Sequence, residues 1–309
     1  MTAVYPGVLR NSWRAPEWTL DDLIAAKRGR TVSVVLPALN EESTVAGVVD
    51  SIVPLLGELV DDVVVLDSGS VDATAAEASR AGARVVTREQ AVPELSPRPG
   101  KGEVLWRSLA ATDGDIVVFV DSDLLDPSPY FVPSLLGPLL FDRGVRLVKG
   151  FYRRPLRIDG VSTNQGGGRV TELVARPLLS ALRPELAGVL QPLGGEYAAT
   201  RELLTSIPFA PGYGVEIGIL LDTYHRFGID SIGQIDLGVR MHRNRPTSEL
   251  AVMSRQIMTT MFGRLGIVDS HEGLMQFGAG GDVFQTSAAD LMIQDRPPMD
   301  EIRSEIRAS

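Results

Sequence analysis

Residues 31–56 read TVSVVLPALNEESTVAGVVDSIVPLL, and the periodicity of this stretch changes once. The first eight residues, TVSVVLPA, are mostly apolar and β-branched, which is typical of a buried strand. Between residues 42 and 56 apolar side chains recur at helical spacing, and Glu42 and Ser43 stand near the start. The stretch therefore predicts a strand followed directly by a helix.

The same alternation continues through the first half of the chain. Further strands are predicted at 61–70, 83–88 and 115–120, and helices at 71–82 and 100–114. Strands that alternate with helices indicate βαβ units, and continuous apolar strands indicate burial on both faces of the sheet. We therefore expect an α/β fold with a mainly parallel sheet flanked by helices.

Polar loops follow three of the predicted strands. They read PALNEE after the first strand, DSGS after the second and DSD after the fourth. Open α/β sheets bind ligands beyond the carboxyl ends of their strands, so these loops are expected to converge on one site. The chain has neither a GxGxxG after its first strand nor a GxxxxGK[ST] anywhere, so the dinucleotide fingerprint and the P-loop are both missing.

The DSD triplet places Asp121 and Asp123 directly after the apolar run 117–120. Neighbouring carboxylates repel each other and resist burial, so they need exposure or a cationic partner. A turn with an Asx cap is the simple interpretation of an isolated D-x-D. Because this triplet ends a buried strand at the ligand edge, we favour a Mg²⁺ or Mn²⁺ ion that carries a nucleotide diphosphate.

The second half of the chain offers a candidate anion site. A glycine run at 166–168 leads into a helix that begins at Arg169. Glycine allows close backbone approach, and free N–H groups at a helix start bind anions. A flexible connector is the alternative, but an arginine at a helix start is unfavourable unless an anion lies there. We favour a phosphate or carboxylate site.

Single polar residues leave alternatives open. His242 lies in the basic stretch RMHRNR (240–245), where it is either a surface histidine or a neutral metal ligand among arginines that bind phosphates. The other two histidines, His225 and His271, carry no such signal. Glu216 either caps a helix or accepts a substrate hydroxyl, and Lys101 either binds a phosphate or faces solvent.

Composition limits the class of protein. The chain has 309 residues, 44% hydrophobic residues and a net charge of −9, which argues against a nucleic-acid partner. With no cysteine, disulfides and thiolate metal sites are excluded, in keeping with a cytoplasmic protein. Neither a signal-peptide core nor an apolar run of ~18 residues is present, so no membrane insertion is expected.

Longer stretches carry a resemblance to a known family. VVLPALNEE, VLDSGSVDAT and DIVVFVDSD resemble the nucleotide-binding half of GT-A glycosyltransferases. FYRRPL, GGGRVTELVARPLL, LQPLGGEYAA, FAPGYGVEIG and HRNRP resemble the actinobacterial glucosyl-3-phosphoglycerate synthases, retaining enzymes of family 81. The resemblance covers residues 18–265. It implies transfer of glucose from UDP-glucose to D-3-phosphoglycerate, at the start of methylglucose lipopolysaccharide synthesis, by a metal-dependent homodimer.

The resemblance also implies roles for single residues. Asp123 and His242 would bind the metal, and these two with Glu216 would form the catalytic group. The donor would contact Pro37, Ala38, Leu39, Asn40, Glu41, Ser68, Lys101, Asp121, Ser122, Tyr213, Glu216, Arg240 and Arg245. The acceptor would contact Gly168, Arg169, Val170, Thr171 and Asn244.

Two rival enzyme activities and one non-catalytic role are alternatives to this expectation. A mannosyl-3-phosphoglycerate synthase would use GDP-mannose at the same kind of site. A sugar-phosphate nucleotidyltransferase typically carries a glycine-rich basic loop after its first strand, and PALNEES has none. A nucleotide-sugar sensor would not need both the DSD triplet and the HRNRP stretch.

Three regions are expected along the chain. Residues 1–30 would form an N-terminal arm and helix, and residues 31–150 the nucleotide-sugar-binding subdomain. Residues 151–309 would form a C-terminal acceptor-binding lobe and a tail. The last ~40 residues are rich in glycine and aspartate, which favours mobility in part of that tail.

Overall fold

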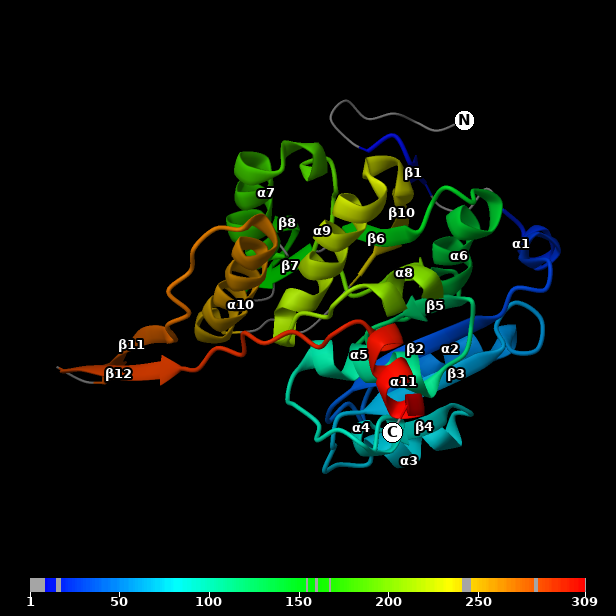
Figure 1. The fold of residues 1–309 in the computed structure, drawn as a ribbon, viewed down its shortest axis with the longest axis horizontal. Helices are drawn as coiled ribbons and strands as arrows, with labels where there is room; N and C mark the ends of the chain where they lie inside the picture. Colours follow the sequence, from blue (N-terminus) through cyan, green and yellow to red (C-terminus); the bar gives the residue numbers. More distant parts are fainter. Residues whose placement is uncertain are drawn as a thin grey trace.

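The computed structural model describes residues 9–14, 18–153, 155–158, 161–166, 168–240, 246–280 and 283–308. Its centre is an eight-stranded sheet in the order β1-β10-β6-β9-β5-β2-β3-β4 (Figure 1). The strands are β1 (Ser12–Trp13), β2 (Val32–Ala38), β3 (Asp62–Asp67), β4 (Arg84–Thr87), β5 (Ile116–Phe119), β6 (Leu147–Arg153), β9 (Tyr197–Thr200) and β10 (Ile232–Val239).

One strand runs against all the others. β9 pairs antiparallel with both β5 and β6, whereas every other pair in this sheet is parallel. The carboxyl ends of the parallel strands therefore meet at one edge of the sheet, and the start of β9 lies at that edge too. This geometry gathers the three polar loops that the sequence predicted, and it adds Gly195 and Glu196 from just before β9.

Helices cover both faces of the sheet (Figure 1). The α-helices of the first half are α1 (Leu20–Lys27), α2 (Val45–Ile52), α3 (Thr74–Arg80), α4 (Arg88–Ala91), α5 (Lys101–Ala111) and α6 (Phe131–Phe141). Those of the second half are α7 (Arg176–Leu182), α8 (Arg201–Ser206), α9 (Val215–Phe227), α10 (Thr247–Leu265) and α11 (Met299–Ala308). The α/β class expected from the sequence is confirmed.

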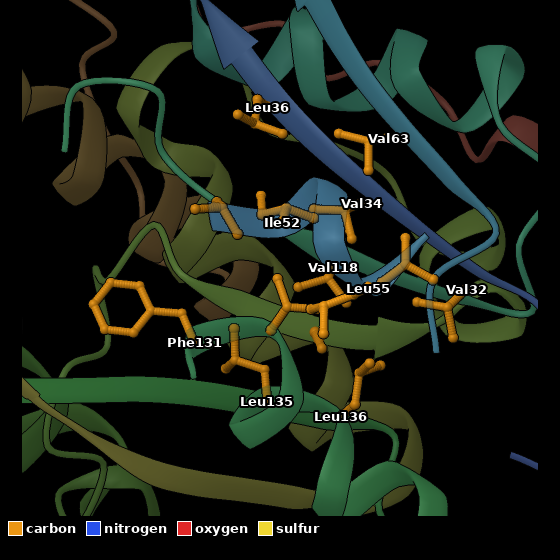
Figure 2. Close-up of a cluster of buried hydrophobic side chains, with 14 of the residues drawn as sticks. Val32, Val34, Leu36, Ile52, Leu55, Val63, Val118, Phe131, Leu135 and Leu136 are labelled. Carbon is orange, nitrogen blue, oxygen red and sulfur yellow. The ribbon is translucent and has the colours of Figure 1, made fainter. Parts of the chain in front are cut away.

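Alternate residues of the central strands pack into two separate hydrophobic cores. Val34 and Leu36 of β2 and Val118 of β5 belong to the core that also contains side chains from α2 and α6 (Figure 2). Val35 and Phe119 point to the other face, into the core with α5, α9 and α10. Both faces of these strands are buried, which explains why their sequences are continuously apolar.

The most apolar run of the chain forms a buried helix. The run 130–141, YFVPSLLGPLLF, contains α6, whose residues are almost all buried although Pro138 lies inside the helix. Gly137 lets the Trp18 ring lie against the helix, because a methyl group there would collide with it. Within the part of the chain that the structure describes, no helix combines the length and the apolar character that a membrane span needs.

The C-terminal segment is anchored to the body of the protein, although its composition favoured mobility. The hairpin of β11 (Leu274–Gly280) and β12 (Val283–Ala289) extends away from the body, and the chain then returns to it (Figure 1). Arg296 donates to the Glu103 carboxylate at 2.6 Å and exchanges two backbone hydrogen bonds with Phe209. Glu103 also accepts from Arg107 at 2.6 Å, so a buried ion triad fastens the returning segment to α5.

Candidate active site

A cavity of about 610 Å³ opens at the carboxyl edge of the sheet. Its wall comes from the loops after β2, β3 and β5, the start of α5, the segment before β9, the helical turn at 169–171, the start of α9, the end of β10 and α10. The lining residues are Pro37, Ala38, Leu39, Glu41, Ser68, Gly100, Lys101, Val104, Asp121, Ser122, Asp123, Gly168, Arg169, Val170, Thr171, Leu193, Gly195, Gly212, Tyr213, Glu216, Arg240, Leu250, Met253, Gln256, Ile257 and Met292.

The loops after β2 and β3 are tied together at one end of this cavity. Asn40 has a positive φ of 57°, and its side-chain oxygen accepts from the Val71 amide at 3.0 Å. Its own amide donates to the Ser70 hydroxyl at 2.9 Å. Asn40 therefore braces the loops rather than lining the cavity, while Pro37 and Ser68 form the wall beside it.

Asp121 is held between two cations at the floor of the cavity. The Lys101 ammonium donates to one carboxylate oxygen at 2.6 Å, and the Arg240 guanidinium donates to the other at 3.1 Å. Burial would raise the pKa of Asp121, but the two cations outweigh burial and hold that pKa well below its ordinary value. Asp121 is therefore a fixed anion throughout the range in which proteins function.

The same two cations bind further carboxylates. Lys101 contacts Glu216, at the start of α9, with 2.8 Å between Nζ and Oε1, and Glu216 is 4% exposed. Burial would lower the pKa of Lys101, but Asp121 and Glu216 raise it well above its ordinary value. Arg240 reaches Glu196 and the Tyr152 hydroxyl, each at 2.8 Å.

Asp123 differs from Asp121 in its surroundings. One of its oxygens accepts from Arg240 at 3.1 Å, and its side chain is 33% exposed toward the cavity. Asp121 is already engaged by cations on both oxygens, so Asp123 is the better placed of the two to offer an oxygen to a hard cation. This carboxylate chemistry fits the Mg²⁺ or Mn²⁺ ion that the sequence predicted. The residues that the structure describes contain no group of three or more possible ligands.

The glycine-led segment forms another wall of the cavity. Gly168 has a φ of 81°, a value that favours glycine, and Arg169 starts the helical segment. A π-helical turn follows at Thr171–Ala175 before α7 begins. π-helical turns often lie at functional sites, and Arg169 and Thr171, just before and at the start of this one, line the same cavity as Asp121.

Several lining residues carried no signal that sequence reasoning could use. Gln256 of α10 accepts from the Tyr213 amide at 3.0 Å and so fixes the turn before α9. Met253 and Ile257 from the same helix form an apolar side of the cavity, and Met292 comes from the returning C-terminal segment. Their helical spacing marks a buried face of α10, but which surface it covers depends on contacts between distant parts of the chain.

Three predicted site residues, His242, Asn244 and Arg245, lie outside the described residues. The other two histidines are described. His225 lies in the last turn of α9, and His271 is exposed in the loop before β11. The lining of the cavity includes neither of them.

Known proteins resemble this chain in sequence over most of its length. The model of the family described as "Glycosyl transferase family 2" matches residues 33–155. Glucosyl-3-phosphoglycerate synthase from Mycolicibacterium smegmatis is 67% identical over 293 residues, which cover 95% of this chain and 97% of that protein. The enzyme of the same name from Petrotoga mobilis is 44% identical over 242 residues, 77% of this chain and 74% of the relative.

Solved structures are similar over nearly the whole chain. The crystal structure of glucosyl-3-phosphoglycerate synthase from Mycobacterium tuberculosis with Mn²⁺, UDP and phosphoglyceric acid superposes with a TM-score of 0.90 at 61% identity, covering 96% of this chain and 99% of that chain. A structure of the same enzyme with Mn²⁺, UDP-glucose and phosphoglyceric acid gives a TM-score of 0.88 at 60% identity, with the same coverage of both chains.

Proposed function

Because the chain belongs to the glucosyl-3-phosphoglycerate synthase family of glycosyltransferases, we propose that it transfers glucose from UDP-glucose to D-3-phosphoglycerate with retention of configuration. The observation that carries the proposal is one cavity in which the aspartates after β5 face the Arg169 segment. The first group suits a nucleotide diphosphate with its metal, and the second suits a small anionic acceptor. A single cavity thus serves both substrates.

We assign the donor site to residues 31–150 and the acceptor site to residues 151–309. Where these two regions meet, each also contributes residues to the site of the other. The uridine would lie against Pro37 and Ser68, at the joined ends of β2 and β3. The sugar would lie near Lys101, Asp121 and Glu216, whose polar atoms face the cavity. Arg169 and Thr171 would hold the phosphate or carboxylate of the acceptor.

Asp123 would hold Mg²⁺ or Mn²⁺, with His242 as the second protein ligand that the family resemblance implies. The ion, when bound, would neutralise negative charge on the departing diphosphate. Arg240 is 5% exposed and fixed by Glu196, so its guanidinium offers a preorganised positive charge beside the same aspartates. Little reorganisation is then needed when UDP leaves.

The surroundings of Glu216 favour same-face attack over double displacement. A double displacement needs a carboxylate nucleophile free to approach the anomeric carbon. Glu216 is the candidate that the motifs suggest, but its Oε1 lies 2.8 Å from the Lys101 ammonium, and its side chain is nearly buried. We assign Glu216 to holding Lys101 and a sugar hydroxyl, and the acceptor proton to the leaving phosphate oxygen.

The rival activities have less support. A nucleotidyltransferase would need basic groups at the loop after β2, which instead carries Glu41 and Glu42.

A cytoplasmic location is in keeping with the absence of cysteine. A nucleic-acid partner is disfavoured by the net charge of −9.

The donor is tested directly by comparing turnover of UDP-glucose and GDP-mannose with 3-phosphoglycerate and Mg²⁺. We expect UDP-glucose to be used and GDP-mannose to be turned over at least ~100-fold more slowly, because a pocket that hydrogen-bonds one substrate rejects an analogue that leaves its polar groups unpaired. A preference for GDP-mannose would identify the mannosyl enzyme instead, and release of pyrophosphate from a sugar phosphate would identify a nucleotidyltransferase.

Asp123→Ala should remove a hard metal ligand and lower kcat on the order of 10³-fold, or about 4 kcal/mol of transition-state stabilisation. Asp126→Ala is the matched control, because Asp126 is an exposed carboxylate three residues further along and outside the lining of the cavity. Rates measured across a Mg²⁺ titration decide the question. Near wild-type activity with an unchanged Mg²⁺ requirement would show that Asp123 does not bind the metal.

Arg169→Ala should weaken 3-phosphoglycerate while UDP-glucose binds almost as before, since the donor is held by loops on other strands. The loss of a charge-assisted contact should cost ~2–4 kcal/mol, or roughly 30- to 1000-fold in affinity. Arg169→Lys should restore part of it, because an ammonium cannot make the bidentate contact. Separate calorimetric titrations of the two ligands measure this, with Arg183→Ala, outside the cavity lining, as control. Loss of donor affinity instead would mean that the two halves of the site are assigned wrongly.

We also propose a homodimer in solution, supported by the hairpin β11–β12. It extends away from the body (Figure 1) and exposes Met275 and Phe277, whose relative accessibilities are 57% and 68%. Two-stranded hairpins are marginally stable alone, and exposed apolar side chains on one are often covered by a partner. Light scattering should give twice the mass of the chain, and Phe277→Asp should reduce it. A wild-type monomer at micromolar concentration would refute the proposal.

A further inference from the structure

A lysine lies buried beneath the cavity without a role in the mechanism above. Lys149 is in the middle of β6, where it pairs with Tyr197 of β9 on one side and Gln234 of β10 on the other. Its side chain is 1% exposed. Its ammonium donates to the Gly194 carbonyl at 2.6 Å and lies 4.5 Å from the centre of the Tyr197 ring.

The acceptor of that hydrogen bond belongs to the wall of the cavity. Leu193 and Gly195, on either side of Gly194, both line the cavity. The Gly194 amide donates to the Gln191 carbonyl at 3.1 Å, which makes the segment a tight turn. Gly195 packs so closely on Asp121 that a methyl group at this position would collide with its carboxylate. Any shift of this turn therefore moves the surface on which Asp121 rests.

Burial of a lysine is costly, so its presence here calls for a reason. An apolar side chain of similar volume is often as stable as a buried charge, or more stable. Burial lowers the pKa of Lys149 to about 8, opposed by Glu216, Glu196 and Asp121 and reinforced by Lys101. Lys149 thus adds a third cation to Lys101 and Arg240 in a layer whose carboxylates are those of Asp121, Glu196 and Glu216.

We propose that Lys149 is a positioning residue for glucosyl transfer, which fixes the Leu193–Gly195 turn against Asp121 through its hydrogen bond to the Gly194 carbonyl. The proposal rests on the function proposed above and assigns a further residue to it. Lys149 touches neither substrate: it acts through the turn, and the turn shapes the part of the cavity assigned to the sugar. The role requires an N–H donor that can reach the Gly194 carbonyl, which an apolar core residue lacks.

The position of the turn determines whether substrate binding or glucosyl transfer itself depends on Lys149. The nucleotide loops belong to β2 and β3, and the acceptor segment lies at 168–171, so neither includes the turn. Lys149→Met should therefore lower kcat, while the Kd of UDP stays within about twofold of wild type. A displacement of about 1 Å at a reacting centre costs on the order of 100-fold in rate, and we expect a loss of that size.

A second variant separates the hydrogen bond from packing. Lys149→Gln keeps an N–H donor without the charge, so its kcat should be about tenfold higher than that of Lys149→Met. Because it keeps a polar group in the site, it also provides the test if the methionine variant does not fold. A role in packing alone would give both variants activities that follow their stabilities, with no dependence on the donor.

Lys27 supplies a matched control. It is also a buried lysine, 9% exposed, and it donates to a backbone carbonyl, that of Glu58, at 3.0 Å. Lys27→Met should lower thermal stability and leave kcat unchanged, because no residue of α1 lines the cavity. If Lys149→Met keeps kcat within threefold of wild type, or loses kcat and UDP affinity in parallel, the inference is wrong.

The outcomes also distinguish this inference from the proposed function. Wild-type protein that transfers no glucose to 3-phosphoglycerate would refute the function before any variant is measured. Normal wild-type transfer with a fully active Lys149→Met would refute the positioning role and leave the function standing. Calorimetry measures the binding of UDP without any acceptor, so it reports on the nucleotide loops in either case.

Discussion

The carboxylate of Asp121, held by an ammonium on one oxygen and a guanidinium on the other, is the interaction on which the site depends. Lys101 comes from the start of α5 and Arg240 from the end of β10, so the Arg240 contact joins parts of the chain that are far apart in sequence. A buried carboxylate without such partners would cost several kcal/mol. The need to pair Asp121 thus holds the start of α5, the loop after β5 and the end of β10 in one arrangement.

Reversal of one strand makes this arrangement possible. β9 runs antiparallel between β5 and β6, so the residues before it, rather than those after it, reach the ligand edge. Glu196 then binds Arg240 from beneath, and the glycines before it allow the chain to pass close to Asp121. A β9 parallel to its neighbours would place Thr200 at this edge, and Arg240 would lose its buried anion.

Part of this structure follows from the sequence. Periodicity predicted four strands and three helices between residues 31 and 120, although not α4 or α6. The strand-end rule predicted that the loops at Asn40, Ser68 and Asp121 would converge. α2 ends at Ile52, earlier than its pattern suggests, because Pro54 allows only a 3₁₀ turn after it. Local pattern could not predict the C-terminal segment, because the contact between Arg296 and Glu103 that holds it joins residues far apart in the chain.

Sequence reasoning predicted only part of the site. Arg240 and Glu216 were noted in the sequence and given roles by the family resemblance, whereas Glu196, Tyr152 and Lys149 gave no signal. The sequence alone does not show whether a polar side chain in or beside an apolar strand is buried. Pairing of β6 with β9 and β10 is what buries them. The residues that complete the site are thus specified by sheet order, which composition and periodicity do not determine.

The configuration of the product tests the account most directly. Wild-type protein incubated with UDP-glucose, 3-phosphoglycerate and Mg²⁺ should release one UDP for each glucoside formed, and proton NMR of the fresh product should show an α-linked anomeric proton. This result would show that glucose is transferred with the configuration that it has in UDP-glucose, as the account requires. A β-linked product, or UDP released without any glucoside, would contradict the account.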